Sequence, residues 1–175
     1  GIDALGFTPE QRALYEGVLD HPQGMILVTG PTGSGKTVTL YTGLNLLNEV
    51  QRNICTAEDP VEIKVPGVNQ VNISNRQGVT FGNVARTILR QDPDIIMLGE
   101  MRDQETIDTA VKAAHTGHLV LSTLHANSAP KVIPRLRNLE VDAYNIASTV
   151  NLIIGQRLLR TIDPSCRETV EVSRQ

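Results

Sequence analysis

The chain has 175 residues, a formal net charge of −3 and a hydrophobic content of 40%, which is enough for one well-formed core. No run approaches the roughly 18 apolar residues that span a bilayer, and the first residues lack the basic-then-apolar pattern of a secretory signal. The mild acidity and the aromatic content of 3% argue against a nucleic-acid groove, which needs a basic track and stacking rings. We therefore expect a cytoplasmic domain with no direct membrane insertion and no nucleic-acid partner.

The first elements are a helix, a turn and a strand. Residues 8–11 combine a threonine cap, a proline at the first helical position and a capping-box glutamine, which predicts a helix that ends near residue 19. Residues 21–24 carry a turn signal, and the apolar run 25–29 predicts the first strand.

The strand leads directly into the pattern G-x-x-x-x-G-K-[ST], which is matched at every fixed position. Its glycines let the backbone curl until N–H groups point at phosphate oxygens, and the following helix adds its positive N-terminal end. Lys36 can reach the β- and γ-phosphates, and Thr37 offers a hydroxyl oxygen to Mg²⁺. We therefore predict that a nucleoside triphosphate binds here with Mg²⁺. The predicted nucleotide contacts are Gly30, Pro31, Thr32, Gly33, Ser34, Gly35, Lys36, Thr37 and Thr39.

A second strand and a surface insert are predicted next. After a helix over residues 36–50, the β-prone run 53–57 stops at a Glu-Asp-Pro sequence. Residues 61–65 alternate in polarity, a Pro-Gly turn signal follows, and residues 68–73 alternate again. This pattern predicts a small antiparallel insert on the surface, outside the core.

Strands and helices alternate over the rest of the chain. We expect helices over residues 80–91, 103–114, 129–137 and 142–149, strands over residues 94–98 and 118–124, and an apolar segment over residues 152–159. Such alternation with apolar strands is typical of a mainly parallel sheet with helices on both faces, whose ligands bind at the carboxyl ends of the strands. We therefore predict an α/β fold with one domain over residues 1–160 and a polar tail over residues 161–175.

The strand ends decide which acids can serve the nucleotide. Asp94 and Glu100 bracket one strand and lie about 20 Å apart, so only one of them can reach the metal. Glu100 follows the carboxyl end and is predicted to organise Mg²⁺ or its waters, whereas Asp94 is predicted to be a strand-start or capping residue. Glu58 and Asp59 leave the second strand on the nucleotide side, where a carboxylate can orient or deprotonate the attacking water. Glu58 is the leading candidate for this base.

Two histidines bracket a further strand. His125 emerges on the catalytic edge, where it can sense the γ-phosphate or relay its loss to a neighbouring subunit; the alternative is a histidine that caps the next helix. Strand geometry puts His118 on the opposite side and favours a structural role, although Gly117 beside it permits an irregular turn. No third ligand is spaced to make the pair a metal site.

Arginines supply candidate charge stabilisers. Arg86 and Arg90 are four residues apart on one predicted helix, so they share a face. Together with Arg102, Arg135 and Arg157 they are candidates for stabilising charge across a subunit boundary. The commoner alternative for each of them is a surface salt bridge.

Four blocks of the sequence resemble the secretion ATPases of type II secretion and type IV pilus systems, specifically the C-terminal nucleotide-binding domain of the pilus-assembly type. The blocks are residues 30–37, 55–62, 90–103 and 116–127, and the likeness extends to about residue 160. The resemblance implies a RecA-like P-loop NTPase fold, a ring of six identical subunits and hydrolysis of ATP with Mg²⁺. It also implies a peripheral position at the inner membrane, through a platform protein that assembles pilin fibres.

The resemblance assigns roles to four residues. Glu58 matches the family's aspartate-box glutamate, and Glu100 matches its Walker B glutamate. His118 and His125 match its box histidines. For His118 this opposes the strand geometry, and we keep it as a catalytic candidate with the other three.

Three departures from the family's pattern matter. His115 stands where relatives commonly carry glutamate, and residues 163–166 stand where many carry the first Cys-x-x-Cys of a tetracysteine zinc site. We therefore expect no zinc, and interpret residues 161–175 as a degenerate remnant of a zinc-binding segment, unless Cys166 marks the boundary of a fragment. The family's N-terminal domains are absent from this sequence, so the fragment is expected to hydrolyse ATP slowly and to assemble poorly.

The leading hypothesis is an ATP-driven motor for pilus assembly or secretion. The alternatives are a pilus retraction motor of the same family, a nucleic-acid translocase on the same fold and a nucleotide switch without catalysis. Residues 151–158 look more like the assembly type than the retraction type. The acidic balance and the few aromatic residues disfavour the translocase.

Overall fold

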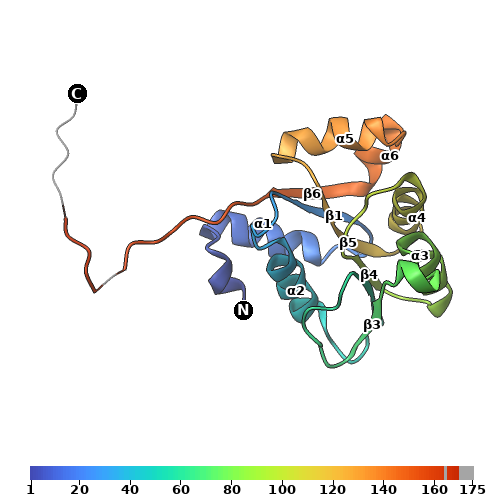
Figure 1. Ribbon diagram of the computed structural model, residues 1–175, viewed down its shortest axis with the longest axis horizontal. Coiled ribbons are helices and arrows are strands. Elements are labelled where there is room, and N and C mark those ends of the chain that lie inside the picture. Colours follow the sequence, from blue (N-terminus) through green and yellow to red (C-terminus); the bar gives the residue numbers. More distant parts are fainter. Residues whose placement is uncertain (164, 170–175) are drawn as a thin grey trace.

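A parallel sheet forms the centre of the molecule (Figure 1). The computed structural model describes residues 1–163 and 165–169. The strands in this part of the chain are β1 (Gly24–Thr29), β2 (Ile54–Glu58), β3 (Val68–Asn72), β4 (Ile95–Leu98), β5 (Leu119–Leu124) and β6 (Val150–Gly155). They lie in the order β3-β2-β4-β5-β1-β6, and every neighbouring pair is parallel, as predicted for an α/β fold.

Helices cover both faces of this sheet (Figure 1). They are α1 (Pro9–Leu19), α2 (Lys36–Leu47), α3 (Phe81–Ile88), α4 (Gln104–His115), α5 (Val132–Asn138) and α6 (Ala143–Thr149). Side chains of α1 and α2, such as Tyr15 and Leu44, share one apolar core with Ile26 of β1. Side chains of α3 to α6, such as Ile107, share a second core with Leu27 on the other face of the same strand. Among the described residues, no helix combines the length and the apolar character needed to cross a bilayer.

Capping side chains set several element boundaries. The Thr8 hydroxyl accepts a hydrogen bond from the Gln11 backbone, and the Gln11 side chain accepts one from the Thr8 backbone, which confirms the predicted capping box of α1. Asp103 caps α4 through its carboxylate alone, which accepts a hydrogen bond of 2.8 Å from the Thr106 backbone. Asp94 accepts a hydrogen bond of 2.7 Å from the Asn53 backbone through Oδ2, and so ties the start of β4 to the start of β2. Its predicted role at the strand start is confirmed.

The predicted antiparallel insert is wrong. The segment after the Pro-Gly turn forms β3, which pairs in parallel with β2, with Asn72 opposite Glu58, and makes one edge of the main sheet. Residues 61–65 form no strand; they belong to the crossover from β2 to β3, and Val65 is buried in the core on the α2 side. Antiparallel pairing among the described residues is limited to one isolated bridge beyond β3.

The chain beyond β6 leaves the sheet without regular secondary structure up to residue 163 (Figure 1). Cys166 is exposed and Cys55 is buried in β2, and both are free thiols. The predicted polar tail falls partly outside the described residues, at position 164 and at positions 170–175.

Candidate functional site

The phosphate loop, residues 30–37, leaves the carboxyl end of β1 and leads into α2. Gly33 and Gly35 have φ angles of 75° and 83°, in the left-handed region that favours glycine. A Cβ on Gly35 would come within 3.0 Å of Nε2 of Gln156, and one on Gly30 would collide with the Gln156 carbonyl oxygen. The glycines therefore permit the curled form of the loop, and their lack of side chains lets the chain after β6 pack closely against it.

The loop lines a cavity of about 490 Å³ at the carboxyl ends of the strands. Residues 32–37 contribute one part of the lining. The chain leaving β2, β4 and β5 contributes Glu58, Glu100 and His125. The meeting of strand ends predicted from the sequence is therefore present, and it brings both candidate glutamates to the phosphate loop.

Lys36 folds back onto its own loop. Its Nζ donates hydrogen bonds of 3.1 Å and 2.9 Å to the carbonyl oxygens of Gly30 and Pro31. Burial lowers the pKa of Lys36, and the negative charge of Glu100 opposes that change. The ammonium group thus stays in the loop that would hold phosphate.

The Ser34 hydroxyl is a buried polar group without a partner. Ser34 is 3% exposed, and among the described residues its Oγ makes no hydrogen bond. Buried hydroxyls normally have a hydrogen-bond partner, and a ligand or a water bound in this loop would give the Ser34 hydroxyl one. The curled backbone, the Lys36 ammonium and this hydroxyl together fit a triphosphate.

Glu100, Arg102 and His125 form a charged group on the cavity lining. Nε of Arg102 lies 2.5 Å from Oε2 of Glu100, and Nε2 of His125 lies 3.3 Å from the same oxygen. The Glu100 side chain is 12% exposed, whereas that of Arg102 is 66% exposed. The Thr123 hydroxyl donates to the carbonyl of Gly99 at 2.7 Å and fixes the chain where it leaves β4. Glu100 is therefore held at the cavity, with an exposed cation on its open side.

Glu58 ends β2 as a buried carboxylate, with 3% of its surface exposed. Its Oε2 accepts a short hydrogen bond from the Tyr41 phenol. Its Oε1 accepts hydrogen bonds from the Thr56 hydroxyl at 2.5 Å and from the Gln70 amide at 3.1 Å. Sequence reasoning missed these three donors; the one available signal was that Tyr41 lies about one helical turn beyond Thr37.

Thr37 and Glu100 are the residues that fit Mg²⁺. Both line the cavity. Mg²⁺ keeps several waters and takes one or two protein ligands beside phosphate oxygens, so a hydroxyl and a nearby carboxylate form an adequate donor set. Among the described residues, no group of three or more His, Cys, Asp or Glu side chains gathers into a metal site of any other kind.

Four of the predicted nucleotide contacts and catalytic candidates do not line the cavity: Gly30 and Pro31 at the start of the phosphate loop, Thr39 and His118. Thr39 is fully buried, and its hydroxyl donates to Oε1 of Gln156 at 2.7 Å, so it contacts the chain after β6 instead of the phosphate loop's open side. His118 lies at the amino end of β5, with Nδ1 3.0 Å from the carbonyl oxygen of Ala113. Strand geometry predicted this position for His118, and the structure does not bring its imidazole to the two glutamates.

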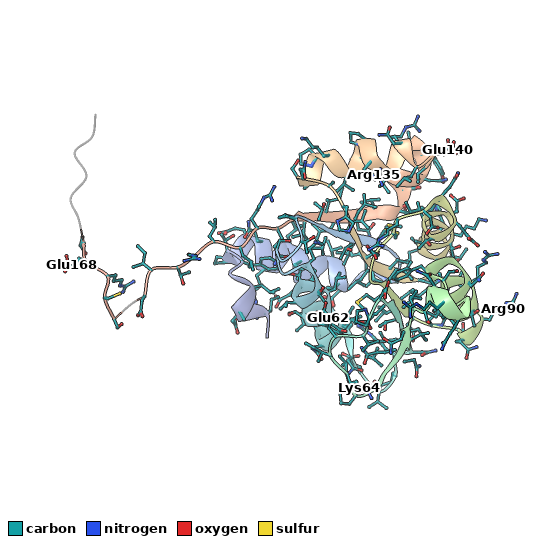
Figure 2. All side chains as sticks on the ribbon, viewed as in Figure 1. Glu62, Lys64, Arg90, Arg135, Glu140 and Glu168 are labelled. Carbon is teal, nitrogen blue, oxygen red and sulfur yellow. The ribbon has the colours of Figure 1, made fainter. Side chains whose placement is uncertain are left out.

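Arg86 and Arg90 also lie away from the cavity. Arg86 forms an ion pair with Glu105 of α4. Arg90 is exposed just after α3, at the periphery of the molecule (Figure 2). Of these candidates only Arg102 is in the cavity lining. Stabilisation of charge across a subunit boundary by Arg86 and Arg90 stays a prediction.

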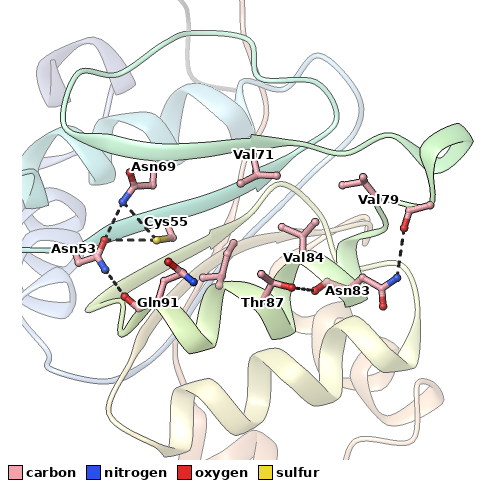
Figure 3. A pocket seen from close by; sticks show the side chains of 11 residues that line it. Asn53, Cys55, Asn69, Val71, Val79, Asn83, Val84, Thr87 and Gln91 are labelled. Carbon is pink, nitrogen blue, oxygen red and sulfur yellow. Dashed lines mark hydrogen bonds between the residues drawn. The ribbon is translucent and has the colours of Figure 1, made fainter.

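A second cavity, of about 570 Å³, lies between β2, β3 and α3 (Figure 3). Its lining mixes apolar side chains such as Val71 and Val84 with amides such as Asn53 and Asn69. None of the described residues that line it carries a charge. A triphosphate is strongly negative and needs cations or a helix N-terminus, so the cavity at the phosphate loop suits it and this one does not.

Comparison with known proteins agrees with this geometry. The chain is 60% identical to the type IV pilus assembly ATPase PilB of Acinetobacter baylyi over 172 residues, which are 98% of this chain and 30% of the relative. It is 45% identical to the type II secretion system ATPase E of Vibrio cholerae, over 99% of this chain and 35% of the relative. The chain thus spans about a third of the length of these curated relatives.

A solved structure and a family model give the same result. The crystal structure of the pilus retraction motor PilT with bound ADP matches with a TM-score of 0.78 and 38% identity, over 90% of this chain and 48% of that one. The fold is therefore the RecA-like α/β fold of these ATPases. The model of the family described as "Type II/IV secretion system protein" matches residues 1–175. The chain belongs to the type II/IV secretion system protein family.

Proposed function

We propose that this chain is the motor domain that binds and hydrolyses ATP to power type IV pilus assembly or type II secretion at the inner membrane. The observation that carries the proposal is the single cavity in which the phosphate loop, Glu58 and Glu100 meet. The ATPases among its relatives support the proposal, although each of them is about three times as long as this chain.

The phosphate loop would bind the triphosphate through its backbone N–H groups and through Lys36. The Lys36 ammonium exchanges its bonds to the Gly30 and Pro31 carbonyls for bonds to phosphate oxygens, which are stronger acceptors because they are charged. The Thr37 hydroxyl would hold Mg²⁺ directly, and Glu100 would hold it through a water. When bound there, the cation would supply positive charge beside the phosphate oxygens.

Glu58 would orient or deprotonate the water that attacks the terminal phosphorus, and Asp59 beside it is the alternative. His125 shares Oε2 of Glu100 with Arg102, so it is well placed to sense the terminal phosphate. Arg102 would turn from Glu100 toward phosphate when nucleotide binds. His118, at the far end of β5, contributes to hydrolysis only through contacts outside this cavity.

The assembly that we propose is a ring of six identical subunits, cytoplasmic and peripheral at the inner membrane through a platform protein. Arg86 and Arg90 would act across the boundary between subunits. The chain by itself is expected to turn over ATP slowly, because it spans only about a third of the length of its ATPase relatives. The 60% identity to an assembly ATPase, against 38% to the retraction motor, supports assembly over retraction.

Phosphate release by the wild-type protein and two variants tests the proposal. Lys36→Ala removes the phosphate-binding cation and Glu100→Gln removes the charge that organises the metal. We expect each to lower phosphate release by about a hundredfold. Lys112→Ala, on the exposed side of α4, is the matched control and should leave the rate unchanged.

Two results would contradict the motor hypothesis. If neither Lys36→Ala nor Glu100→Gln lowers phosphate release, the cavity is not where ATP is hydrolysed. If single-stranded DNA stimulates the rate several-fold, a nucleic-acid translocase is the better description.

A further inference from the structure

The two carboxylate oxygens of Glu58 differ in how many of their lone pairs accept hydrogen bonds. Oε1 accepts from Thr56 and from Gln70, so its two lone pairs are both engaged. Among the described residues, Oε2 accepts from Tyr41 alone and keeps a second lone pair. This arrangement fixes the plane of the carboxylate and gives one oxygen, Oε2, the capacity to accept a hydrogen bond from a water in the cavity.

The Tyr41 phenol is a donor at neutral pH. Burial, followed by the hydrogen bond to Glu58, raises the pKa of Tyr41 to about 12. The phenol therefore keeps its proton, and its single O–H is directed at Oε2 of Glu58. Tyr41 is 4% exposed, so water does not compete freely for this bond.

Tyr41 belongs to the same helix as the phosphate-binding residues. α2 begins at Lys36, and Tyr41 lies five positions further along it. The helix that grips the phosphates therefore also holds the carboxylate of Glu58 at the end of β2. One helix therefore connects the phosphate loop to the side chain that donates to Glu58.

The donors to Glu58 also hold the crossover segment, residues 61–65. The backbone N–H of Ile63 donates to the Tyr41 oxygen at 3.4 Å. The Gln70 amide donates to the Ile63 carbonyl at 2.9 Å and accepts from the Val65 backbone at 2.8 Å. Both N–H donors of the Gln70 side chain and one lone pair of its oxygen are thus engaged, so a shift of the segment 61–65 would move the two side chains that orient Glu58.

We propose that Tyr41 and Gln70 are positioning residues for Glu58. Their hydrogen bonds direct the free lone pair of Glu58 Oε2 toward the attacking water. The inference rests on the proposed function, because it gives Tyr41 a role only if Glu58 acts on that water. Neither side chain needs to touch the nucleotide. Their removal should therefore slow the chemical step and spare binding.

The test is steady-state ATP hydrolysis by the intact protein carrying Tyr41→Phe, a change that removes one hydroxyl. We expect kcat to fall about tenfold, because a misdirected base loses rate steeply with small displacements. The KM for ATP, and the affinity for a fluorescent ATP analogue, should stay within about twofold of wild type because binding is untouched. Tyr144→Phe, at an exposed tyrosine of α6, is the matched control and should leave both constants unchanged.

A double mutant shows whether Tyr41 acts on hydrolysis through Glu58 or only by stabilising the fold. In a Glu58→Gln background, Tyr41→Phe should cause little further loss, since the two side chains act as one unit. Additive losses, or an unchanged kcat in Tyr41→Phe, would overturn the inference. Should Tyr41→Phe fail to fold, Gln70→Ala decides the matter: it must lower kcat without raising KM.

Phosphate-release measurements distinguish an error in the role of Tyr41 from an error in the proposed function. If Lys36→Ala and Glu100→Gln abolish hydrolysis while Glu58→Gln does not, the motor stands and the positioning role of Tyr41 falls. If the intact wild-type protein releases no phosphate from ATP, the proposed function falls and the inference falls with it.

Discussion

Among single residues, Ser34 is expected to contribute to the affinity for ATP but not to the stability of the fold. Its buried hydroxyl has no protein partner among the described residues, so the folded chain without nucleotide gains nothing from it. We expect Ser34→Ala to leave the free energy of unfolding unchanged or to raise it by up to about 1 kcal/mol. Affinity for ATP should fall about ten- to a hundredfold, because a hydrogen bond to a charged phosphate oxygen contributes about 1.5–3 kcal/mol. Urea unfolding and nucleotide titration measure the two effects.

Ser122→Ala is the matched control for this prediction. Ser122 is as fully buried as Ser34, but its hydroxyl donates to the Leu98 carbonyl at 2.7 Å. Removing it leaves a buried carbonyl less satisfied, so the free energy of unfolding should fall by about 1 kcal/mol or more while ATP affinity stays unchanged. The same stability loss in Ser34→Ala would show that its hydroxyl is already paired inside the protein.

How far single site residues can be predicted from sequence depends on how local their partners are. The phosphate loop is a run of eight neighbours, residues 30–37, and Glu58 and Glu100 directly follow strands, so pattern and topology were enough to bring them together. Tyr41 and Gln70 reach Glu58 from 17 and 12 positions away through tertiary packing, and no periodicity encodes that contact. Their roles can be inferred only from the positions of the side chains in the structure.

Among elements, the contact between α1 and α2 depends on a glycine. A Cβ on Gly43 would collide with Oη of Tyr15 and come within 3.2 Å of Leu121 Cδ2. Overpacking of this kind costs about 1–3 kcal/mol, and alanine gains only about 1 kcal/mol over glycine in a helix. We therefore expect Gly43→Ala to lower the free energy of unfolding in urea.

Gly17 is the control position on the partner helix. It is exposed in α1, and nothing lies within 4 Å of a Cβ built there. Gly17→Ala should therefore raise the free energy of unfolding by about 0.5–1 kcal/mol. If both alanines stabilise the protein, α1 and α2 do not pack as closely as described.

The misassigned edge of the sheet shows what alternation can and cannot predict. Alternating polarity over residues 68–73 correctly indicated a strand, since it reports which side chains face inward. It carries no information on strand direction, and the Pro-Gly turn suggested a hairpin. The crossover 61–65 is held instead by the Gln70 side chain and the burial of Val65, and both come from tertiary packing.

For the molecule as a whole, nucleotide should act as a stabiliser. A ligand that binds only the folded chain adds about 2.7 kcal/mol to the free energy of unfolding when its free concentration is 100 times its Kd. For a domain of this size that shift raises Tm by about 5–10 °C. We expect ATP with Mg²⁺ to produce this increase in a thermal melt of the wild type. ATP should leave the Tm of Lys36→Ala unchanged, and an equal increase there would place the ligand elsewhere.

The segment that leaves β6 is hydrogen-bonded to the elements at both ends of the phosphate loop. Gln156 donates its backbone N–H to the Thr29 carbonyl at 2.8 Å, at the end of β1, and its side chain is bonded to Thr39 in α2. Tension on the outgoing chain is therefore transmitted to both ends of the phosphate loop. A pull along this segment would change the geometry of the loop that is proposed to hold the triphosphate, and a bound triphosphate would in turn stiffen the segment.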